Sequence, residues 1–330
     1  MEYKITRRDF IKTMLSATAS LMTASCKLVS DDNLSVNGDA MPMRSLGSTG
    51  QMVSLLGLGG QSEVEQWDSS LAVDIINYAI DNGINYIDTN YYYGNGASET
   101  NIGLVMASRR AEVFLATKST SRTYSGVISN FNTSLSRLQT DYVDLYQVHN
   151  IGTEDDVTDL FTSDAYGRTA IDAFVQLRDE GKARFIGITG HHDPVQLLAV
   201  LTHEDAPTFD AVLMALNPAD RHIKPFQDEL LPYAVSKKMA IIAMKVTGMN
   251  YLFQDIPNMT DCLNYVYSLP ISCAIVGIDT IAHLEQNIQI TRNFSNPLSV
   301  EEMEDLENMT HGTPLSGSPK YGDWFKIDRY

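Results

Sequence analysis

Residues 113–149 hold the pattern that identifies the architecture of this chain. They read VFLATK at 113–118, then a segment with helical spacing at Gly126–Leu138, and finally YVDLYQVH at 142–149. The first and last runs are short, apolar and rich in β-branched and aromatic residues, as buried strands are. A strand, a helix and a second strand in this order predict one parallel unit with a right-handed crossover.

The same alternation recurs along most of the chain. Eight strand-like runs are expected, at Leu55–Gly59, Asn85–Asp88, Val113–Lys118, Tyr142–His149, Arg184–Thr189, Phe209–Leu216, Ala240–Val246 and Ser272–Ile278. Helical spacing predicts helices at Leu71–Asn82, Ser98–Ala107, Gly126–Leu138, Ile171–Glu180, Pro194–Thr202, Phe226–Lys237, Thr260–Leu269 and Ile281–Arg292. Eight such units in about 250 residues match the number and size of a closed (β/α)8 barrel, whereas a doubly wound sheet usually has fewer strands.

A single α/β domain, a TIM barrel over residues 43–311, is therefore predicted. A Gly-containing turn between two short apolar runs predicts a β-hairpin at Ser45–Ser54, which would cap the barrel. Residues 27–42 are interpreted as a linker and residues 312–330 as a C-terminal tail that lies over the barrel. The acidic stretch Glu301–Glu307 is expected to be the solvated face of a helix.

The first 26 residues are predicted to be a targeting segment. Residues 6–12 read TRRDFIK, and an uncharged stretch rich in small and apolar residues follows at 13–25. This order is typical of a twin-arginine export signal, which would make the export machinery a partner and the periplasm the destination. Residues 24–26 offer a lipoprotein cleavage site and residues 17–19 a competing one, so a lipid anchor on Cys26 stays open. No run reaches the about 20 apolar residues that a transmembrane helix needs.

Composition narrows the class of protein. With 44% apolar and 20% charged residues, the chain has an ordinary globular balance, which excludes disorder, collagen and coiled coil. The 24 basic and 41 acidic residues give a net charge of −17, which argues against nucleic acid or an anionic membrane surface as a partner. Three cysteines, none in a C-x-x-C pair, are too few for a disulfide framework. Cys262 and Cys273 are expected to be small buried hydrophobes.

Four ionisable residues fall at or just after the ends of neighbouring predicted strands: Asp88, Tyr93, Lys118 and His149. The carboxyl ends of barrel strands are where active sites collect. A lysine buried beside an aspartate is unusual, because charged groups are rarely buried unless paired. A nearby ammonium favours the phenolate of a tyrosine, so Lys118, kept charged by Asp88, would make Tyr93 a usable acid. We interpret the group as an apparatus for protonating a carbonyl oxygen as a hydride arrives, with His149 orienting that oxygen or relaying a proton.

At this point the chain resembles a known family, the aldo-keto reductases, over nearly all of residues 43–295. The resemblance is carried by LGSTG at 46–50, GLGG at 57–60, YIDTNYYYGNGASE at 86–99, ATK at 116–118, SLSRL at 134–138, DYVDLY at 141–146 followed by His149, and GKARFIG at 181–187. It implies that Asp88, Tyr93, Lys118 and His149 are the family's catalytic tetrad. It also implies a nicotinamide cofactor, NADP(H) or NAD(H), lying extended across the barrel mouth, and a small carbonyl or alcohol substrate.

The resemblance further implies which residues contact the cofactor. These are Gly59, Gly60, Asp88, Thr189, Gly190, Met244, Gly277, Ile278, Asp279, His283, Gln286 and Asn287. Three positions depart from the family pattern. Thr189-Gly190 replaces Ser-Asn after the fifth strand, and Met244 stands where a ring-stacking aromatic is common, with Lys245 beside it. Asp279 and His283 stand where members that prefer NADP often carry Lys or Ser and then Arg, which shifts the expectation toward NAD and leaves the preference open.

The position of Trp67, Tyr91, Tyr92 and Met249 in loops suggests that they line a substrate pocket, although packing would explain each of them equally well. His149, at its strand end, is expected to contact the substrate oxygen. No metal is expected, because the adjacent His191 and His192 have the wrong spacing for one ion. Asp193 before a proline is instead predicted to cap a helix. Two functions remain: a reductase that moves hydride between NAD(P)H and an aldehyde, ketone or sugar, and a cofactor-binding subunit with little turnover that serves redox sensing or assembly. The complete tetrad favours the reductase.

Overall fold

The computed structural model describes residues 40–66 and 69–311. The predicted export signal, nearly all of the predicted linker, Trp67 and the C-terminal tail lie outside the described residues. Within those residues, no helix is both long enough and apolar enough to cross a membrane.

Eight parallel strands close into one barrel, and their order around the barrel is their order in the chain. The strands are β3 (Leu56–Gly59), β4 (Tyr86–Asp88), β5 (Phe114–Ser119), β6 (Val143–Val148), β7 (Ala183–Gly190), β8 (Ala211–Ala215), β9 (Ala240–Met244) and β10 (Cys273–Gly277). Pairing of Gly277 with Gly59 joins the last strand to the first. The predicted (β/α)8 barrel is thus confirmed, with strand ends shifted by one or two residues.

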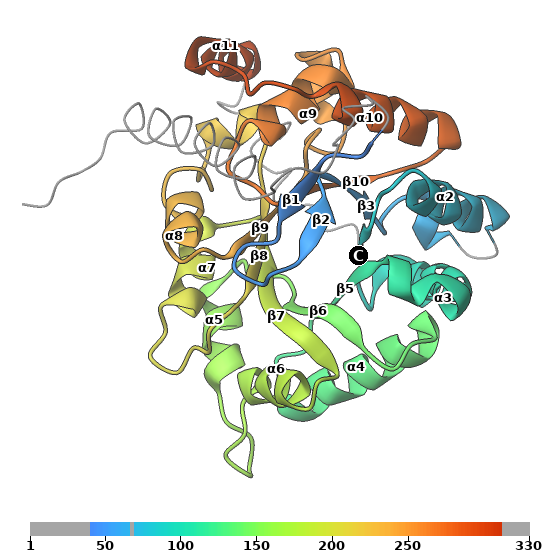
Figure 1. Ribbon diagram of the computed structural model, residues 1–330. Helices are drawn as coiled ribbons and strands as arrows, with labels where there is room; N and C mark the ends of the chain where they lie inside the picture. Colours follow the sequence, from blue (N-terminus) through green and yellow to red (C-terminus); the bar gives the residue numbers. More distant parts are fainter. Residues whose placement is uncertain (1–39, 67–68, 312–330) are drawn as a thin grey trace, which may run out of the picture.

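Helices surround the barrel, as Figure 1 shows. They are α2 (Ser70–Asp81), α3 (Ala97–Arg109), α4 (Tyr124–Leu138), α5 (Glu154–Phe161), α6 (Ala170–Asp179), α7 (Pro194–Leu201), α8 (Leu230–Ser236), α9 (Met259–Tyr267), α10 (Ile281–Asn293) and α11 (Val300–His311). Short 3-10 turns occur at η1 (Glu63–Glu65), η2 (Tyr93–Gly96), η3 (Arg110–Glu112), η4 (Pro218–His222) and η5 (Tyr251–Gln254). The predicted cap of α7 is confirmed, because the Asp193 side chain accepts a hydrogen bond from the amide of Val195.

Two helices differ from the expectation. Helix α5 was not predicted, because its polar surface carries few apolar residues, yet Thr153 and Asp156 form a capping box at its start. Helix α8 begins at Leu230 rather than at Phe226. Residues 226–229 form a turn instead of the first helical turn, and the amide of Phe226 donates to the Asp220 carboxyl group.

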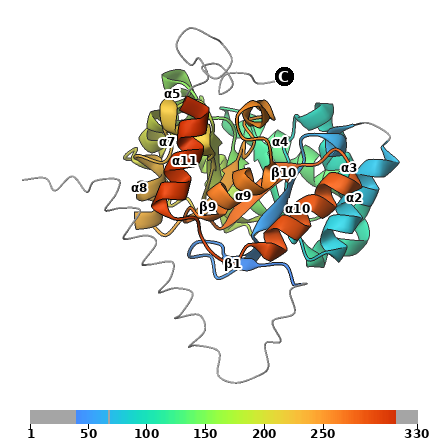
Figure 2. The same ribbon diagram turned by 90° about the horizontal axis from the view of Figure 1, so that it is seen from above.

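The predicted hairpin is present as β1 (Met43–Ser45) paired antiparallel with β2 (Met52–Ser54), and Figure 2 shows β1 at one end of the barrel. Leu46 and Val53 pack with interior barrel residues such as Phe114 and Leu145. The hairpin sits tightly: Gly47 has φ +53°, and a Cβ there would lie 2.3 Å from the backbone nitrogen of Ala240. The hairpin therefore closes the N-terminal end of the barrel and leaves the other end open.

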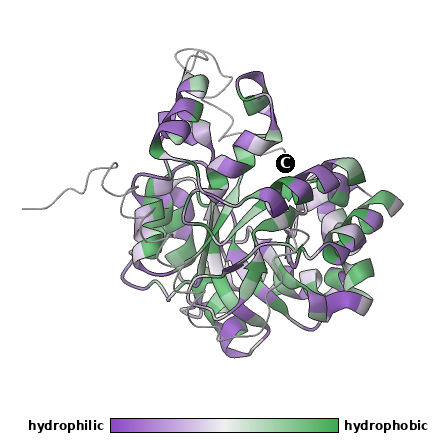
Figure 3. Ribbon diagram, turned by 45° about the horizontal axis from the view of Figure 1, so that its top comes forward, coloured by the Kyte–Doolittle hydropathy of each residue, from purple (hydrophilic) through white to green (hydrophobic). Residues whose placement is uncertain are grey.

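The hydrophobic core has two layers, visible as the hydrophobic strands and inward helix faces in Figure 3. A large layer lies between the strands and the helices, and a smaller one fills the barrel. Inside the barrel, the Phe114 ring stacks between Tyr86 and Phe185, with centroids 5.4 and 6.2 Å away. The predicted burial of Cys262 and Cys273 is confirmed.

Candidate active site

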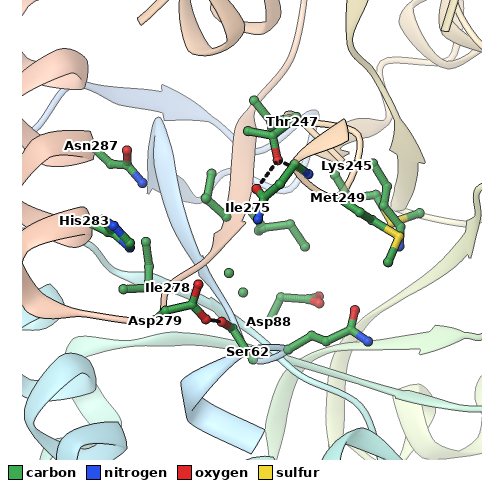
Figure 4. A pocket seen from close by; sticks show the side chains of 18 of the residues that line it. Ser62, Asp88, Lys245, Thr247, Met249, Ile275, Ile278, Asp279, His283 and Asn287 are labelled. Atoms are coloured by element: carbon green, nitrogen blue, oxygen red, sulfur yellow. Dashed lines mark hydrogen bonds between the residues drawn. The ribbon is translucent and has the colours of Figure 1, made fainter. Parts of the chain in front are cut away.

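The carboxyl ends of the strands form the wall of one large pocket of about 770 Å³. Asp88, Tyr93, Lys118 and His149 all line it. Figure 4 shows Lys245 and Met249 on one side of this pocket and His283 and Asn287 on the opposite side, with Asp88 and Ile275 between them. These side chains therefore line opposite walls of the pocket to which the four predicted catalytic residues belong.

Asp88 and Lys118 form a buried ion pair at the base of the pocket. Each side chain is 1% exposed, and the Lys118 ammonium donates both to the Asp88 carboxylate and to the carbonyl oxygen of Thr89, the latter at 2.8 Å. Gln147 donates to the second Asp88 oxygen at 3.0 Å. Burial lowers the pKa of Lys118 and raises the pKa of Asp88, and each charge opposes the shift of the other. Neither charge is stable there without its partner.

Tyr93 and His149 face each other above this pair. The Lys118 nitrogen lies 5.2 Å from the centroid of the Tyr93 ring. The rings of Tyr93 and His149 are perpendicular, with centroids 6.4 Å apart, and His149 is 4% exposed. An ammonium, a phenol and an imidazole thus converge on one volume, which is what protonation of a bound oxygen requires.

A second buried charge holds the loop that carries Tyr93. Glu99, on α3, is fully buried and accepts hydrogen bonds from Thr117 at 2.7 Å and from Arg137 at 3.3 Å. Arg137 also donates to the carbonyl oxygen of Tyr91 at 2.8 Å, and its guanidinium lies 4.6 Å from the centroid of the Tyr91 ring. Tyr91 therefore packs on Arg137 and, among the residues predicted to touch substrate, lies outside the pocket wall.

The residues predicted to contact a cofactor mostly line the pocket. Those that do are Gly59, Gly60, Asp88, Thr189, Met244, Gly277, Ile278, Asp279, His283, Gln286 and Asn287. Gly190 lies outside the wall: a Cβ at this position would meet the Ile151 carbonyl oxygen at 2.4 Å and the Leu197 side chain at 2.5 Å. This packing explains the departure from Ser-Asn, because no side chain fits at residue 190 against these neighbours.

The far end of the pocket lies at the start of α10. Thr280 caps the helix by accepting a hydrogen bond from the amide of His283 at 3.2 Å. Asp279 is exposed and hydrogen bonds to the Ser62 hydroxyl, a contact that Figure 4 shows. The amide side chain of Asn287, one turn further on, is buried. A helix N-terminus favours anions, whereas the Asp279 carboxylate beside it repels them.

The structure adds pocket residues that were not assigned to the site from the sequence. His191, 4% exposed, and Lys245 both line the pocket. Residues of two loops that follow strands of the barrel, 61–66 and 247–258, line it too, as the loop position of Met249 suggests from the sequence. Within the described part of the chain, no three His, Cys, Asp or Glu side chains are grouped as a metal site requires.

Comparison with known proteins agrees with this geometry. The model of the aldo/keto reductase family matches residues 55–261. The oxidoreductase YqkF of Bacillus subtilis is 27% identical over 318 residues, which cover 82% of this chain and 97% of YqkF. L-galactose dehydrogenase of Arabidopsis thaliana is 29% identical over 311 residues, which cover 80% of this chain and 93% of that protein.

Solved structures share the fold. An aldo/keto reductase from Klebsiella pneumoniae in complex with NADP and acetate superposes with a TM-score of 0.66 at 24% identity, over 81% of this chain and 95% of the other. Aldo-keto reductase AKR11C1 from Bacillus halodurans gives a TM-score of 0.66 at 24% identity, over 82% of this chain and 96% of the other. The chain therefore belongs to the aldo/keto reductase family and is an NAD(P)-dependent oxidoreductase that acts on carbonyl groups.

Proposed function

We propose that Tyr93 is the general acid of this oxidoreductase, that Asp88 and Lys118 maintain its electrostatic environment, and that His149 orients the carbonyl oxygen of the substrate. In the reverse direction, Tyr93 accepts the proton of an alcohol. The observation that carries the proposal is the convergence of these four side chains on one pocket at the carboxyl ends of the strands. Their burial supports it, because Lys118 and Asp88 occupy a position where charge is costly.

The pocket fits an extended nicotinamide dinucleotide. Thr189 and His191 offer hydrogen-bonding groups close to the catalytic residues, and the N-terminus of α10 lies at the far end. When bound, the nicotinamide supplies or accepts the hydride. Tyr93 holds the proton that balances this hydride on the substrate oxygen, and the Lys118 ammonium favours the phenolate that remains.

For the substrate we propose a small hydroxylated aldehyde, ketone or sugar. Amide side chains of Gln61, Gln66 and Asn250 line the pocket and can bind hydroxyl groups. The name of the similar Arabidopsis protein, an L-galactose dehydrogenase, supports the same class. We expect D-erythrose to give a kcat/KM about tenfold or more above that of butanal, which has the same number of carbon atoms, because a site built to bind hydroxyls rejects the apolar analogue. Equal values for the two aldehydes would contradict this substrate class.

The test of the catalytic roles is single-turnover oxidation of bound NADPH or NADH by a reactive dicarbonyl. Removal of the phenolic acid in Tyr93→Phe should slow this oxidation by about 10²- to 10⁴-fold, while the dissociation constant of the cofactor stays the same. Tyr92→Phe is the matched control, since Tyr92 is exposed and lies outside the pocket wall. Wild-type protein that binds cofactor and turns over no faster than Tyr93→Phe would instead identify a cofactor-binding subunit.

We also propose that the chain is exported folded, with its cofactor bound, through the twin-arginine machinery. Arg7 and Arg8 followed by the uncharged stretch at 13–25 support this, and export of a folded protein suits a redox enzyme that must load cofactor before it leaves the cytoplasm. Fractionation of cells that produce the Arg7→Lys/Arg8→Lys variant should find it in the cytoplasm. Wild-type protein recovered from the periplasm without cofactor would contradict the loading step. Loss of membrane association in Cys26→Ser would identify the lipid anchor.

A further inference from the structure

Arg122 lies in the loop between β5 and α4, close to the active site but outside the wall of its pocket. Its side chain is 15% exposed. One terminal nitrogen donates to the carbonyl oxygens of Thr120 at 3.1 Å and His149 at 2.7 Å. The other donates to the carbonyl oxygen of Asn150 at 3.1 Å and to the Asp156 carboxylate at 2.9 Å. One guanidinium thus joins four acceptors, two of them on the segment that carries His149.

Asp156 completes this arrangement from the other side. Its second oxygen accepts hydrogen bonds from the amides of Gly152 at 3.0 Å and Thr153 at 2.9 Å. These bonds and the Arg122 charge lower the pKa of Asp156 despite its partial burial. The carboxylate is therefore charged at neutral pH and binds the guanidinium and the backbone of residues 152–153 together.

The His149 segment is held at both of its backbone polar groups. Its amide donates to the carbonyl oxygen of Ser119 at 2.8 Å, and its carbonyl oxygen accepts from Arg122. Both partners belong to the end of β5 and the loop after it. These two hydrogen bonds therefore fix the position of the His149 backbone relative to β5, the strand that carries Lys118.

We propose that Arg122 is a positioning residue. By binding the backbone of residues 149–150 it keeps the His149 imidazole at the correct position relative to Tyr93 and the substrate oxygen, and the Asp156 carboxylate in turn fixes the Arg122 guanidinium. The proposal rests on the catalytic roles assigned above. The planar guanidinium is suited to this task, since it presents five donors in a rigid fork, whereas a lysine offers three donors on one atom. Displacement of a catalytic group by about 1 Å can reduce a rate by about 10²-fold.

A matched control lies at the opposite end of the same strand. Arg110, 13% exposed, donates to the carbonyl oxygens of Val113 at 2.8 Å and Tyr142 at 3.3 Å and to the Asp144 carboxylate at 2.8 Å. Its burial is close to that of Arg122, and like Arg122 it donates to backbone carbonyl oxygens and to one aspartate. It also donates to the Thr140 hydroxyl at 3.1 Å, and none of its partners belongs to the pocket wall. A role that is only structural predicts the same consequences for both arginines.

The experiment compares Arg122→Met and Arg110→Met, each alone and combined with His149→Ala. We expect Arg122→Met to slow single-turnover hydride transfer by about 10- to 100-fold, with the dissociation constant of the cofactor within twofold of wild type. Both arginine variants should lower the melting temperature, and only Arg122→Met should lower the rate. In the His149→Ala background, Arg122→Met should cause no further loss of rate, because the group it positions is gone. Losses that multiply, or an equal loss in Arg110→Met, would overturn the proposal.

Two further measurements test the proposal even if Arg122→Met does not fold or the wild-type chain is inactive. Arg122→Lys and Asp156→Asn are milder changes for the case in which Arg122→Met does not fold, and each should give a rate between those of Arg122→Met and wild type. NMR of the His149 ring, assigned through His149→Ala, needs no turnover. A shifted His149 resonance in the Arg122 variants but not in Arg110→Met supports positioning even if the wild-type chain proves inactive and the catalytic roles fail. An unchanged resonance together with an unchanged rate refutes it.

Discussion

Buried charges at the two ends of the barrel have different partners. At the N-terminal end, Asp144 is 2% exposed and accepts hydrogen bonds from Arg110 at 2.8 Å, Arg184 at 2.6 Å and the amide of Leu115 at 2.8 Å. At the other end, Asp88 and Lys118 are each 1% exposed and have one charged partner apiece. The Asp144 carboxylate thus has two cationic partners and an amide donor, an arrangement that stabilises the fold. The Asp88–Lys118 pair instead leaves an ammonium beside a phenol in an open pocket, as chemistry requires.

The largest effect should come from breaking the pair in the pocket. Lys118→Met leaves the Asp88 carboxylate buried without a cation, which typically costs about 3–5 kcal/mol of stability, and hydride transfer should slow by about 10²-fold or more. In the double variant Asp88→Asn/Lys118→Met both charges are gone, so the free energy of unfolding should recover while the rate does not. Urea unfolding and single-turnover kinetics measure the two quantities. Recovery of both, or of neither, would show that stability and catalysis are not separable at this pair.

The complementary change at the closed end should affect stability alone. Asp144→Ala removes the acceptor of two guanidinium groups and of the Leu115 amide, and we expect a loss of about 3 kcal/mol. The rate of hydride transfer in the folded fraction should equal that of wild type, since Asp144 lies outside the pocket wall. The variant sharpens the contrast between the two ends. A rate loss larger than twofold at a temperature where the variant is fully folded would break it.

The barrel itself is the part of the structure that the sequence predicts best. The strand periods, the hairpin turn and the alternation with helices predict the barrel, because burial of strands and helix faces imposes regular spacing on apolar residues. Asp88, Lys118 and His149 can be placed at the pocket from the sequence because they occupy predicted strand ends, which the same spacing locates, and Tyr93 follows one of these ends in the next loop. Arg122, Arg110 and Asp144 carry no such pattern. The two arginines donate to carbonyl oxygens of loops that are distant in the sequence, His149 for Arg122 and Tyr142 for Arg110, and only the folded chain shows which carbonyl oxygens face a given guanidinium.

Two residues that the sequence predicts to contact a ligand, Gly190 and Tyr91, lie outside the pocket wall because of their packing partners. Gly190 lies under the carbonyl oxygen of Ile151, a contact with the loop after β6 that the dipeptide Thr189-Gly190 cannot reveal. Tyr91 and Tyr93 are two residues apart, yet Arg137 holds the first outside the pocket wall. Spacing can thus locate a loop at the active end, whereas the direction of each side chain within the loop depends on its packing partners.

A third buried carboxyl group, Asp220 in η4, differs from Asp88 and Asp144 because it has no ion-pair partner among the residues that the structure describes, and its effect on stability should therefore depend on pH. Its partners are uncharged donors, the amide of Phe226 at 3.3 Å and the Gln227 side chain at 3.4 Å, and burial raises the pKa of Asp220 to about 8. An unfolded aspartate has a pKa of about 3.9. Between these values the folded state holds a proton that the unfolded state releases, so the contribution of Asp220 to stability is fully present below about pH 3.9 and falls as the pH rises toward 8.

Replacement of Asp220 by a residue that does not ionise should change how the free energy of unfolding depends on pH. Asp220→Asn should gain free energy of unfolding relative to wild type as the pH rises from 5 to 7, by at most about 1.4 kcal/mol per pH unit. Urea unfolding at several pH values measures this difference, and Asp141→Asn, an exposed carboxyl group, controls for the change in net charge. A constant difference between Asp220→Asn and wild type over this range would show that Asp220 is ionised in the folded protein.

The smallest effect concerns cofactor choice at the far end of the pocket. His283 lies in the first turn of α10, and Asp279 precedes that helix in the same pocket wall, whose described residues include no arginine. If the 2′-phosphate binds at this end, we expect it to meet a carboxylate and no guanidinium. His283→Arg adds a fixed positive charge that binds phosphate well, and we expect the NADPH/NADH ratio of affinities to rise about tenfold, which equals about 1.4 kcal/mol. Fluorescence titration with each dinucleotide measures both affinities. Gln289→Arg places the same charge on the same helix outside the pocket wall and should leave the ratio unchanged. An equal rise in both variants would mean that net charge, rather than contact with the 2′-phosphate, sets the preference.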